Sequence, residues 1–342
     1  MLCNQLNIKI ITSNMLNKAI NTNNLVRKES NMSKQTIAYI QMSFAMVAIG
    51  SFVIVNKYII KELPIFIASE LRLLIACLIL LPLFLYKGEK MPKLVKKDYI
   101  IFFLQSFIGV FLFSVCTLYG LRQTTALDSG IIMSCTPAIM ALISYYFLKE
   151  RLGMNKIGGI LLTILGTLSI NVFGQVLNFN VGSHPLIGNM LIFCAVIGEA
   201  IFFSFGKLIS TPLRPLTMTT IMSLTGAVLF LPSAIYQSLH FNFLTVSPLA
   251  WLLVLYTGVV ITVLAVLLMN QGLEVVSAGT AAVFTALMPI STVILSAFIL
   301  HEPLFWYHIF GMTLVILGIF VITNSSSESK EMFEKRSRQE NM

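Results

Sequence analysis

The hydrophobic positions of the chain fall into ten long apolar runs separated by short polar segments. These runs cover approximately residues 36–59, 64–86, 99–122, 124–148, 154–173, 187–209, 215–237, 249–272, 276–300 and 304–323. A helix needs about 20 apolar residues to cross a bilayer core of roughly 30 Å, whereas a β-barrel would show weakly alternating segments of about ten residues. The pattern therefore predicts an all-α membrane protein with ten transmembrane helices.

Composition agrees with this prediction and leaves little material for a soluble domain. Of the 342 residues, 57% are apolar and only 11% are charged, while about a quarter of the residues in soluble domains are charged. The connections between runs are too short for a large extramembrane enzyme module. The five cysteines form no CxxC pair and no Cys/His cluster, so we expect no metal site, disulfide framework or cofactor.

Both ends of the chain are polar and are expected to be disordered cytoplasmic tails, residues 1–35 and 325–342. The first tail lacks the apolar core of about 7–15 residues that a cleavable signal peptide needs. Met32 opens the sequence MSKQTIAYI directly before the first apolar run. Translation therefore starts either at Met1 or at Met32, and both alternatives remain open.

Basic residues predict the orientation of the spans, because Lys and Arg accumulate on the cytoplasmic side. With the amino terminus inside, only Lys57, Lys61 and Arg122 of the 23 basic residues lie outside, and Arg72 lies within a span. Both termini are thus predicted to be cytoplasmic. The net charge of +9 follows from topology and gives no reason to expect a nucleic-acid partner.

A sequence repeat links the two halves of the chain. LKERLGMNKIGGILLTILG at 148–166 returns as LHEPLFWYHIFGMTLVILG at 300–318, and one offset of 152 residues aligns Gly120 with Gly272, Pro137 with Pro289, Glu150 with Glu302, Gly159 with Gly311 and Gly166 with Gly318. One repeat holds five helices, an odd number, so the second copy must enter the membrane from the opposite side. Inverted repeats of this kind are typical of alternating-access carriers.

These residues, with Arg72 in the segment LRLLIACLILLP, resemble the EamA family of the drug/metabolite transporter superfamily. The resemblance implies two five-helix repeats, 36–173 and 187–324, in a multi-pass protein of the bacterial inner membrane. It also implies secondary transport of small metabolites such as amino acids. Helices one to four and six to nine would surround a central cavity, with helices five and ten at the periphery or in a homodimer contact. The chain departs from the family at Gly50-Ser51, where many members carry a tryptophan beside a glycine.

The repeated residues have structural readings and functional ones. Glu150 and Glu302 close their spans just before the next helix, so each is expected to cap the amino end of that following helix. Pro137 and Pro289 fall near the middle of their spans, where they act either as hinges or as packing features. The glycine pairs Gly159/Gly166 and Gly311/Gly318 are spaced for close helix approach.

Charged groups inside the spans are candidates for substrate binding or ion coupling, because a charge near the bilayer centre costs roughly 2.5–3.5 kcal/mol. They are Glu70, Arg72 and Glu199. Arg72 and Glu199 are predicted at similar depth and either pair with each other or meet a substrate. Glu199 would carry a coupling proton or bind an ammonium group, while Glu70 is expected to reach the interface. Further polar and aromatic candidates for the cavity lining are Tyr119, Phe202, Tyr256 and Asn270.

The sequence thus favours a transporter whose partners are a small-molecule substrate and the lipid bilayer. The alternatives are an intramembrane enzyme and a membrane subunit that does not transport. An intramembrane enzyme would need a nucleophile with a base, a paired-aspartate site or a metal cluster at membrane depth. The sequence has no HExxH motif and no aspartate or histidine deep in a span, and it has no ATP-binding motif that would supply energy for transport.

Overall fold

The computed structural model of the chain describes residues 34–89, 95–148, 154–176, 184–206, 213–275, 284 and 287–321. Within these ranges the secondary structure consists of helices and turns, without a strand. The predicted tails lie outside the described residues, except that Lys34 and Gln35 already belong to the first helix.

The first half of the chain contains the helices predicted from its five apolar runs. They are the first helix Lys34–Glu62, α2 Ile65–Tyr86, a third span made of α3 Lys96–Ser106, η1 Phe107–Leu112 and α4 Phe113–Gln123, a fourth made of α5 Ala126–Met133 and α6 Thr136–Leu148, and α7 Met154–Val176.

The second half repeats this order. Its elements are α8 Pro185–Gly206, α9 Pro215–Ser238, the short η2 Phe243–Thr245, a span made of α10 Pro248–Tyr256, η3 Thr257–Ala265 and α11 Val266–Val275, then α13 Leu287–Ile299 and the last helix Trp306–Val321. Among the described helices, six are long and apolar enough to cross a membrane, and four apolar helices are shorter.

Several helices begin at residues that favour a helix start. Pro215 and Pro248 occupy the first turns of α9 and α10, where a missing N–H costs nothing. Ser247 accepts a hydrogen bond from the Ala250 amide, and Thr125 accepts one from the Asp128 amide at the start of α5. These side chains satisfy amides that the helices leave unpaired.

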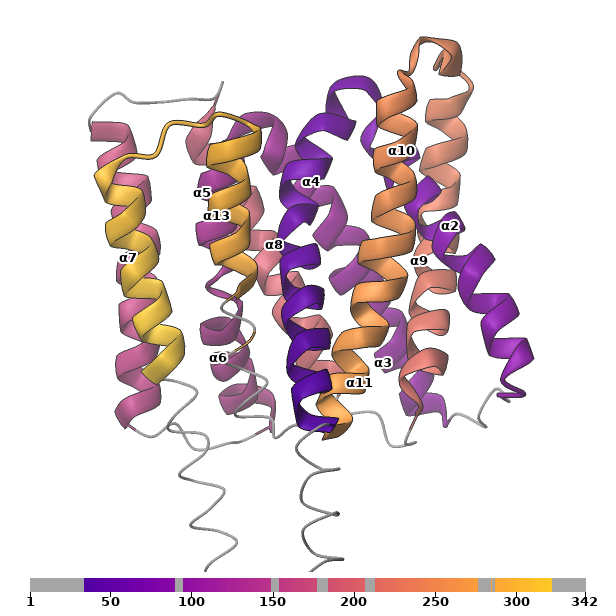
Figure 1. Cartoon of the computed structure of the whole chain (residues 1–342), viewed down its shortest axis with the longest axis horizontal. Coiled ribbons are helices and arrows are strands. Elements are labelled where there is room, and N and C mark those ends of the chain that lie inside the picture. Colours follow the sequence, from indigo (N-terminus) through magenta and orange to yellow (C-terminus); the bar gives the residue numbers. More distant parts are fainter. Residues whose placement is uncertain are drawn as a thin grey trace, which may run out of the picture.

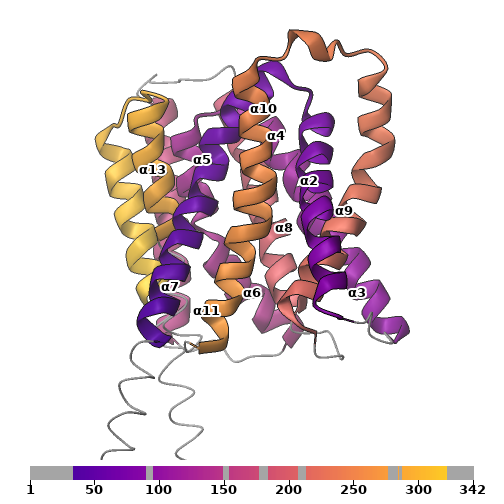
Figure 2. The ribbon, with the colours of Figure 1, turned by 45° about the vertical axis from the view of Figure 1, so that its right-hand side comes forward.

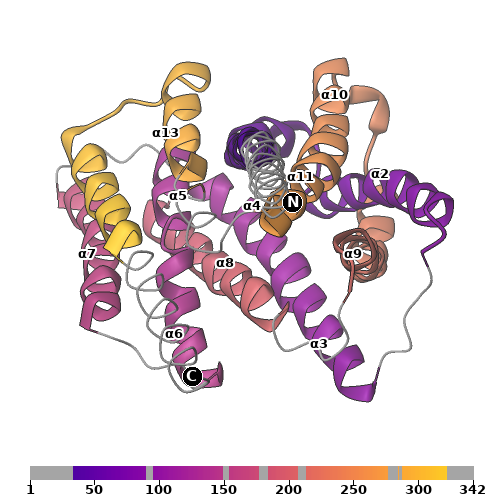
Figure 3. The ribbon, with the colours of Figure 1, turned by 60° about the horizontal axis from the view of Figure 1, so that its bottom comes forward.

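The helices stand side by side in one bundle (Figures 1 and 2). Figures 1 and 3 show α7 beside the last helix at one end and α2 beside α9 at the other. Helices of different halves pack on each other: Leu118 of α4 and Ile192 of α8 share a buried cluster with Val53 of the first helix. The two repeats are therefore interleaved around one core rather than folded as separate domains.

Glycine contacts establish that α7 and the last helix run in opposite directions. A Cβ atom on Gly166 would lie 2.6 Å from the carbonyl oxygen of Gly311, and one on Gly318 would lie 2.6 Å from that of Gly159. As residue numbers rise along α7, the contacted numbers fall along the last helix. The repeat offset of 152 residues relates Gly166 to Gly318 and Gly159 to Gly311, so the two contacts are equivalent under the repeat. The fifth helices of the two repeats are therefore antiparallel.

Two predicted spans are interrupted by π-helical segments, which the sequence did not predict. The segment η1 interrupts the third span, and η3 interrupts the span between α10 and α11. The repeat offset places the η1 residues at 259–264, within η3. At Gly109 in η1 the backbone lies directly against the Phe202 side chain, and at Gly258 in η3 a Cβ would lie 3.1 Å from the Arg72 carbonyl oxygen. Isolated π-segments are uncommon and occur frequently at functional sites.

The fourth span is broken rather than kinked. α5 ends at Met133, residues Ser134 and Cys135 form a turn, and α6 begins at Thr136. Pro137 therefore lies in the first turn of α6 instead of the middle of a continuous helix, because its ring cannot donate to the preceding carbonyls. Pro289 is buried near the described start of α13.

Candidate functional site

Arg72 lies on α2 with few protein partners. Its Nη2 donates a hydrogen bond to Ser114 Oγ of α4 at 3.1 Å, and its guanidinium carbon lies 5.4 Å from the centre of the Phe52 ring. A guanidinium has five N–H donors, so most of its hydrogen-bonding capacity remains available. The described chain places no carboxylate in contact with it.

Two buried hydroxyl groups on α2 and α4 also lack partners. Ser69 and Thr117 are buried, and neither side-chain oxygen has a hydrogen-bond partner. α2 and α4 are antiparallel here, since Phe66 contacts Tyr119 while Arg72 contacts Ser114. Ser69 and Thr117 lie between these two contacts in sequence, one on each helix. The contact between α2 and α4 therefore combines the unused donors of Arg72 with two buried hydroxyl groups on the same helices that have no partner.

Glu199 lies on α8 and contacts the broken fourth span. Its Oε2 lies 2.6 Å from Thr136 Oγ1, and the same hydroxyl lies 2.7 Å from the carbonyl oxygen of Met133. Of the two alternatives for Arg72 and Glu199, the structure does not show the one in which they pair with each other. Arg72 belongs to the contact between α2 and α4, whereas Glu199 faces the start of α6, and similar depth along two helices does not make them neighbours.

The other predicted lining residues have separate partners. Tyr256 Oη lies 2.9 Å from Ser51 Oγ of the first helix, and the carbonyl oxygen of Phe202 accepts a hydrogen bond of 2.7 Å from Gln105. Tyr119 contacts Phe66, and Arg122 lies over its ring. The side chain of Asn270 lies outside the described residues.

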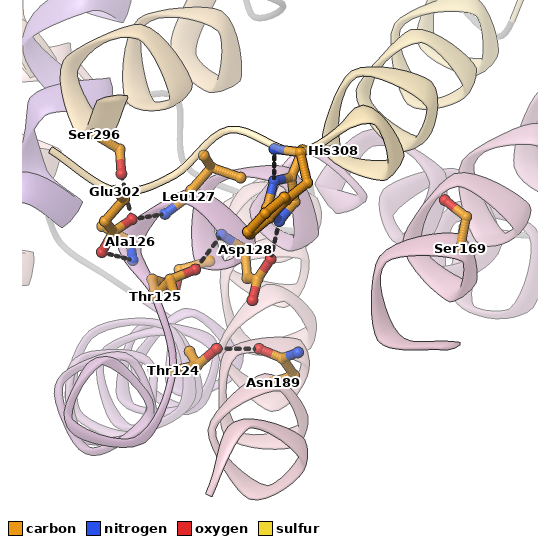
Figure 4. A network of polar contacts seen from close by, with 12 residues as sticks. Thr124, Thr125, Ala126, Leu127, Asp128, Ser169, Asn189, Ser296, Glu302 and His308 are labelled. Carbon is orange, nitrogen blue, oxygen red and sulfur yellow. Dashed lines mark hydrogen bonds and ion pairs between the residues drawn. The ribbon is translucent and has the colours of Figure 1, made fainter. Parts of the chain in front are cut away.

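A second polar group surrounds the connection between α4 and α5, which we call the α4–α5 corner and define as residues 121–128. Lys57 of the first helix donates to the carbonyl oxygens of Leu121 and Thr124. Glu302 accepts hydrogen bonds from the amides of Ala126 at 2.9 Å and Leu127 at 2.8 Å (Figure 4). The lysine therefore caps the carboxyl end of α4 while the glutamate caps the amino end of α5.

One earlier expectation changes at this corner. Glu302 is a helix cap as predicted, but the capped helix is α5 of the first half rather than the helix that follows Glu302. The ammonium group of Lys57 is held by carbonyl oxygens of this corner. Glu150, the repeat partner of Glu302, lies outside the described residues. The glycine pairs do pack as predicted.

His308 and Asp128 extend the corner to the last helix. His308 Nε2 lies 3.1 Å from Asp128 Oδ1, and His308 Nδ1 accepts a hydrogen bond from the Phe305 amide (Figure 4). Because Nδ1 acts as an acceptor, the ring proton is on Nε2 and points to the carboxylate. Thr124 also donates to Asn189 of α8 at 2.6 Å. The corner thus joins the first helix, α4, α5, α8, and the segment that leads into the last helix.

Glu70 was expected to reach the membrane interface, and this expectation is wrong. The residue is buried, and neither carboxyl oxygen has a hydrogen-bond partner. It shares its face of α2 with Phe66 and Leu73, whose neighbours include Phe230 of α9. Among the described residues no three His, Cys, Asp or Glu side chains are grouped as metal ligands would be.

Sequence reasoning missed Thr136 and Ser114, which are the protein partners of the two charged candidates. Thr136 had a usable signal, because it directly precedes Pro137. Proline leaves a carbonyl without its helical donor, and a neighbouring hydroxyl can supply one. Ser114 had no comparable signal, because only the packing of α2 on α4 brings it to Arg72.

Comparison with known proteins gives relatives of similar length. The chain is 42% identical over 295 residues to "Uncharacterized transporter YetK" of Bacillus subtilis (strain 168), covering 85% of this chain and 88% of that protein. It is 25% identical to "Uncharacterized transporter YyaM" of the same organism, covering 72% and 80%. It is also 23% identical to the Arabidopsis thaliana "WAT1-related protein At4g01430", covering 84% and 87%.

A solved structure titled "Crystal structure of protein" shares the fold, with a TM-score of 0.59 at 15% identity over 87% of this chain and 98% of that one. The model of the EamA-like transporter family matches residues 36–172 and again residues 186–324. These two matches cover both predicted repeats and most of the chain. The chain therefore belongs to the EamA-like transporter family and is a membrane transporter rather than an enzyme.

Proposed function

We propose that the protein is a secondary transporter of small zwitterionic metabolites, such as amino acids, across the bacterial cytoplasmic membrane by alternating access. The observation that carries this proposal is the separation of Arg72 from Glu199. Each of these ionisable groups lies within a span, and each has a hydroxyl rather than an opposite charge as its protein partner.

The energetics of buried charge explain why this arrangement favours a zwitterion. A charge within a span costs several kcal/mol unless it is paired, and hydroxyl partners compensate only part of that cost. A substrate carboxylate would form charge-assisted hydrogen bonds with Arg72. A substrate ammonium group would do the same for Glu199. One zwitterionic molecule therefore supplies both missing partners.

Interleaved antiparallel repeats support alternating access as the mechanism. Carriers built from inverted repeats commonly expose a site near the midplane to one side and then to the other. The chain has no nucleotide-binding motif, so we assign the energy for transport to a solute or ion gradient. Cytoplasmic termini, inferred from the distribution of basic residues, complete the proposed topology.

Flux through the full chain in proteoliposomes tests the proposed substrate class. We expect amino acids to be carried, while analogues without the ammonium group and analogues without the carboxylate are carried at least tenfold more slowly. Arg72→Met should abolish amino-acid flux. The matched control is Arg122→Met, because Arg122 is exposed at the end of α4 and should be dispensable.

Two results would contradict this proposal. Equal flux of amines, carboxylic acids and amino acids would remove the zwitterion as the recognised class. Full flux in Arg72→Met, with the protein inserted normally, would remove the arginine from the site.

A homodimer is a further part of the proposal. α7 and the last helix bury their glycines against each other, and their outward faces carry exposed apolar side chains such as Leu165 and Phe320. We assign this face to lipid and to contact with a second copy. Cysteine crosslinking between copies at Leu165 in native membranes, compared with Leu78 on the distant helix α2, tests the contact.

A further inference from the structure

The Thr136 hydroxyl has more acceptors than protons. It lies 2.7 Å from the Met133 carbonyl oxygen and 2.6 Å from Glu199 Oε2, yet a threonine hydroxyl donates one proton and accepts through its lone pairs. A carbonyl can only accept. If Glu199 were an anion, it could also only accept, and one of the two short contacts would have no proton. Both contacts hold together when Glu199 carries the proton and donates to Thr136, which then donates to Met133.

We propose that Glu199 is a proton-binding site that is occupied in this conformation, and that Thr136 couples its charge to the break between α5 and α6. This inference rests on the proposed function in one respect, namely that Glu199 belongs to the transport site. It adds the identity of a ligand, a proton, and a positioning residue, Thr136. It also explains how a carboxyl group can lie among buried residues of α8 without a cation.

Loss of the proton changes the hydrogen bonds in a defined order. The proton leaves Glu199 for water, and the Thr136 hydroxyl turns to donate to the new carboxylate. The Met133 carbonyl then loses this donor. Pro137, four residues along, has no N–H to replace it. Deprotonation therefore leaves a carbonyl without this donor at the break between α5 and α6, next to an anionic carboxylate, and this pair of acceptors suits an ammonium group.

The charged residues on the helices packed against α8 lie too far along those helices to act as charged partners of the Glu199 carboxyl group. Glu199 is the fifteenth residue of α8. On the neighbouring helices, the charged residues lie at the ends: Asp98 and two lysines at the start of α3, Arg122 at the end of α4, and Asp128 in the first turn of α5. The remaining titratable residues on these elements are Tyr99 of α3, Cys116 and Tyr119 of α4, Cys135 in the turn between α5 and α6, Cys194 of α8, and Tyr145 and Tyr146 of α6. Thr136 is the described hydrogen-bond partner of the Glu199 carboxyl.

Infrared spectroscopy of the purified full chain tests this inference without any substrate. A protonated carboxyl group gives a C=O stretching band that an ionised one lacks. In pH-difference spectra we expect wild type to contain one such component that Glu199→Gln removes. Thr136→Val, which keeps the side-chain shape and removes the hydroxyl, should shift that component in frequency and in the pH at which it titrates. Thr136→Ser should leave it close to its wild-type position.

Glu70→Gln is the matched control, because Glu70 is also a buried acid within a span but has no hydroxyl partner. It should remove a different component and leave the Glu199 component in place. The proposal is overturned if Glu199→Gln removes no protonated component, or if Thr136→Val leaves that component unshifted while thermal denaturation shows a folded protein. Either result is independent of flux. A failure to carry amino acids would instead overturn the substrate class and leave the proton site standing.

Discussion

At the residue scale, the α4–α5 corner places each charge at the helix end that favours it. The carbonyls at the carboxyl end of a helix carry partial negative charge, and the amides at the amino end carry partial positive charge. Lys57 binds carbonyl oxygens at the carboxyl end of α4, and Glu302 binds amides at the amino end of α5. This electrostatic match explains why a glutamate is tolerated in such an apolar chain, since its charge is met by two amides and by Ser296.

We predict that Glu302→Ala destabilises the protein by about 2–3 kcal/mol, because hydrogen bonds to a charged group contribute roughly 1.5–3 kcal/mol and two amides would be left unpaired. Glu302→Gln keeps an acceptor and should cost less. Thermal unfolding of the purified chain in detergent measures both. Equal melting temperatures for wild type and Glu302→Ala would contradict the capping role.

Lys57 and Glu302 hold opposite ends of one short connection, so their substitutions should not be independent. We expect Lys57→Met and Glu302→Gln together to destabilise the chain by less than the sum of the single variants, because either change alone already loosens the corner. A double-mutant cycle by thermal unfolding measures the difference. Strict additivity would show that the two side chains act on separate elements.

The sequence offered candidate residues for the site but not the partners that these residues have in the structure. The cap at Glu302 and the charged candidates Arg72 and Glu199 were recognised from polarity in apolar surroundings. The helix that Glu302 caps could not be predicted, because α5 reaches Glu302 only through packing between the two halves. The contact of Ser114 with Arg72 could not be predicted either, because it also depends on how two helices pack.

At the element scale, glycines set how closely α7 and the last helix approach. We predict that Gly166→Ala destabilises the protein by about 1–3 kcal/mol, because its Cβ would lie 2.6 Å from the Gly311 carbonyl oxygen and overpacking typically costs this much. Gly158→Ala is the control in the same helix. A Cβ there meets nothing within 4 Å, so the higher helix propensity of alanine should leave stability unchanged or raise it. Similar losses in both variants would contradict the packing explanation.

The break before α6 gives the proline hinge hypothesis a sharper form. Pro137→Ala restores an N–H that can bond to the Met133 carbonyl, in competition with Thr136. We expect this variant and Pro289→Ala to insert and fold but to transport amino acids several-fold more slowly, because a restored N–H would make the backbone at each position less free to bend.

Pro82→Ala and Pro232→Ala are suitable controls for this experiment, since these prolines lie inside α2 and α9, away from the break. Flux in proteoliposomes, normalised to inserted protein, measures the effect. Unchanged flux in both hinge variants would assign Pro137 and Pro289 to packing alone.

Element existence was predictable where apolar runs were long, and element interruptions were not. A π-segment has no distinctive composition. In η1 it coincides with the close approach of Gly109 to Phe202, a contact between residues far apart in sequence. Once the structure shows one π-segment, the sequence repeat predicts a second at the equivalent position of the other half. The sequence alone does not show that either π-segment exists.

At the scale of the whole molecule, repeat symmetry separates residues that the fold requires from residues that serve one half only. The glycine contacts between α7 and the last helix exchange under the repeat offset. Glu199 does not follow this symmetry, because its counterparts in the first helix are the apolar residues Val47, Ala48 and Ile49. Glu199 is thus a carboxyl group that the repeat symmetry does not demand, in contact with a helix break, and this supports our proposal that it belongs to the transport site.

The inverted topology leads to a prediction about the two faces of the membrane. Asn155 lies in the first turn of α7, and Pro303 lies just before the last helix, and both are exposed. Since Gly159 meets Gly318 and Gly166 meets Gly311, the starts of these antiparallel helices lie at opposite ends of the bundle.

In a chain whose five native cysteines are replaced, we expect a membrane-impermeant thiol reagent to label a cysteine at position 303 in intact cells. A cysteine at position 155 should be labelled only after permeabilisation, because basic residues favour the cytoplasmic side there. Exchanged accessibility would reverse the orientation while keeping the inverted repeat, whereas labelling of both positions from one side would contradict the antiparallel arrangement itself.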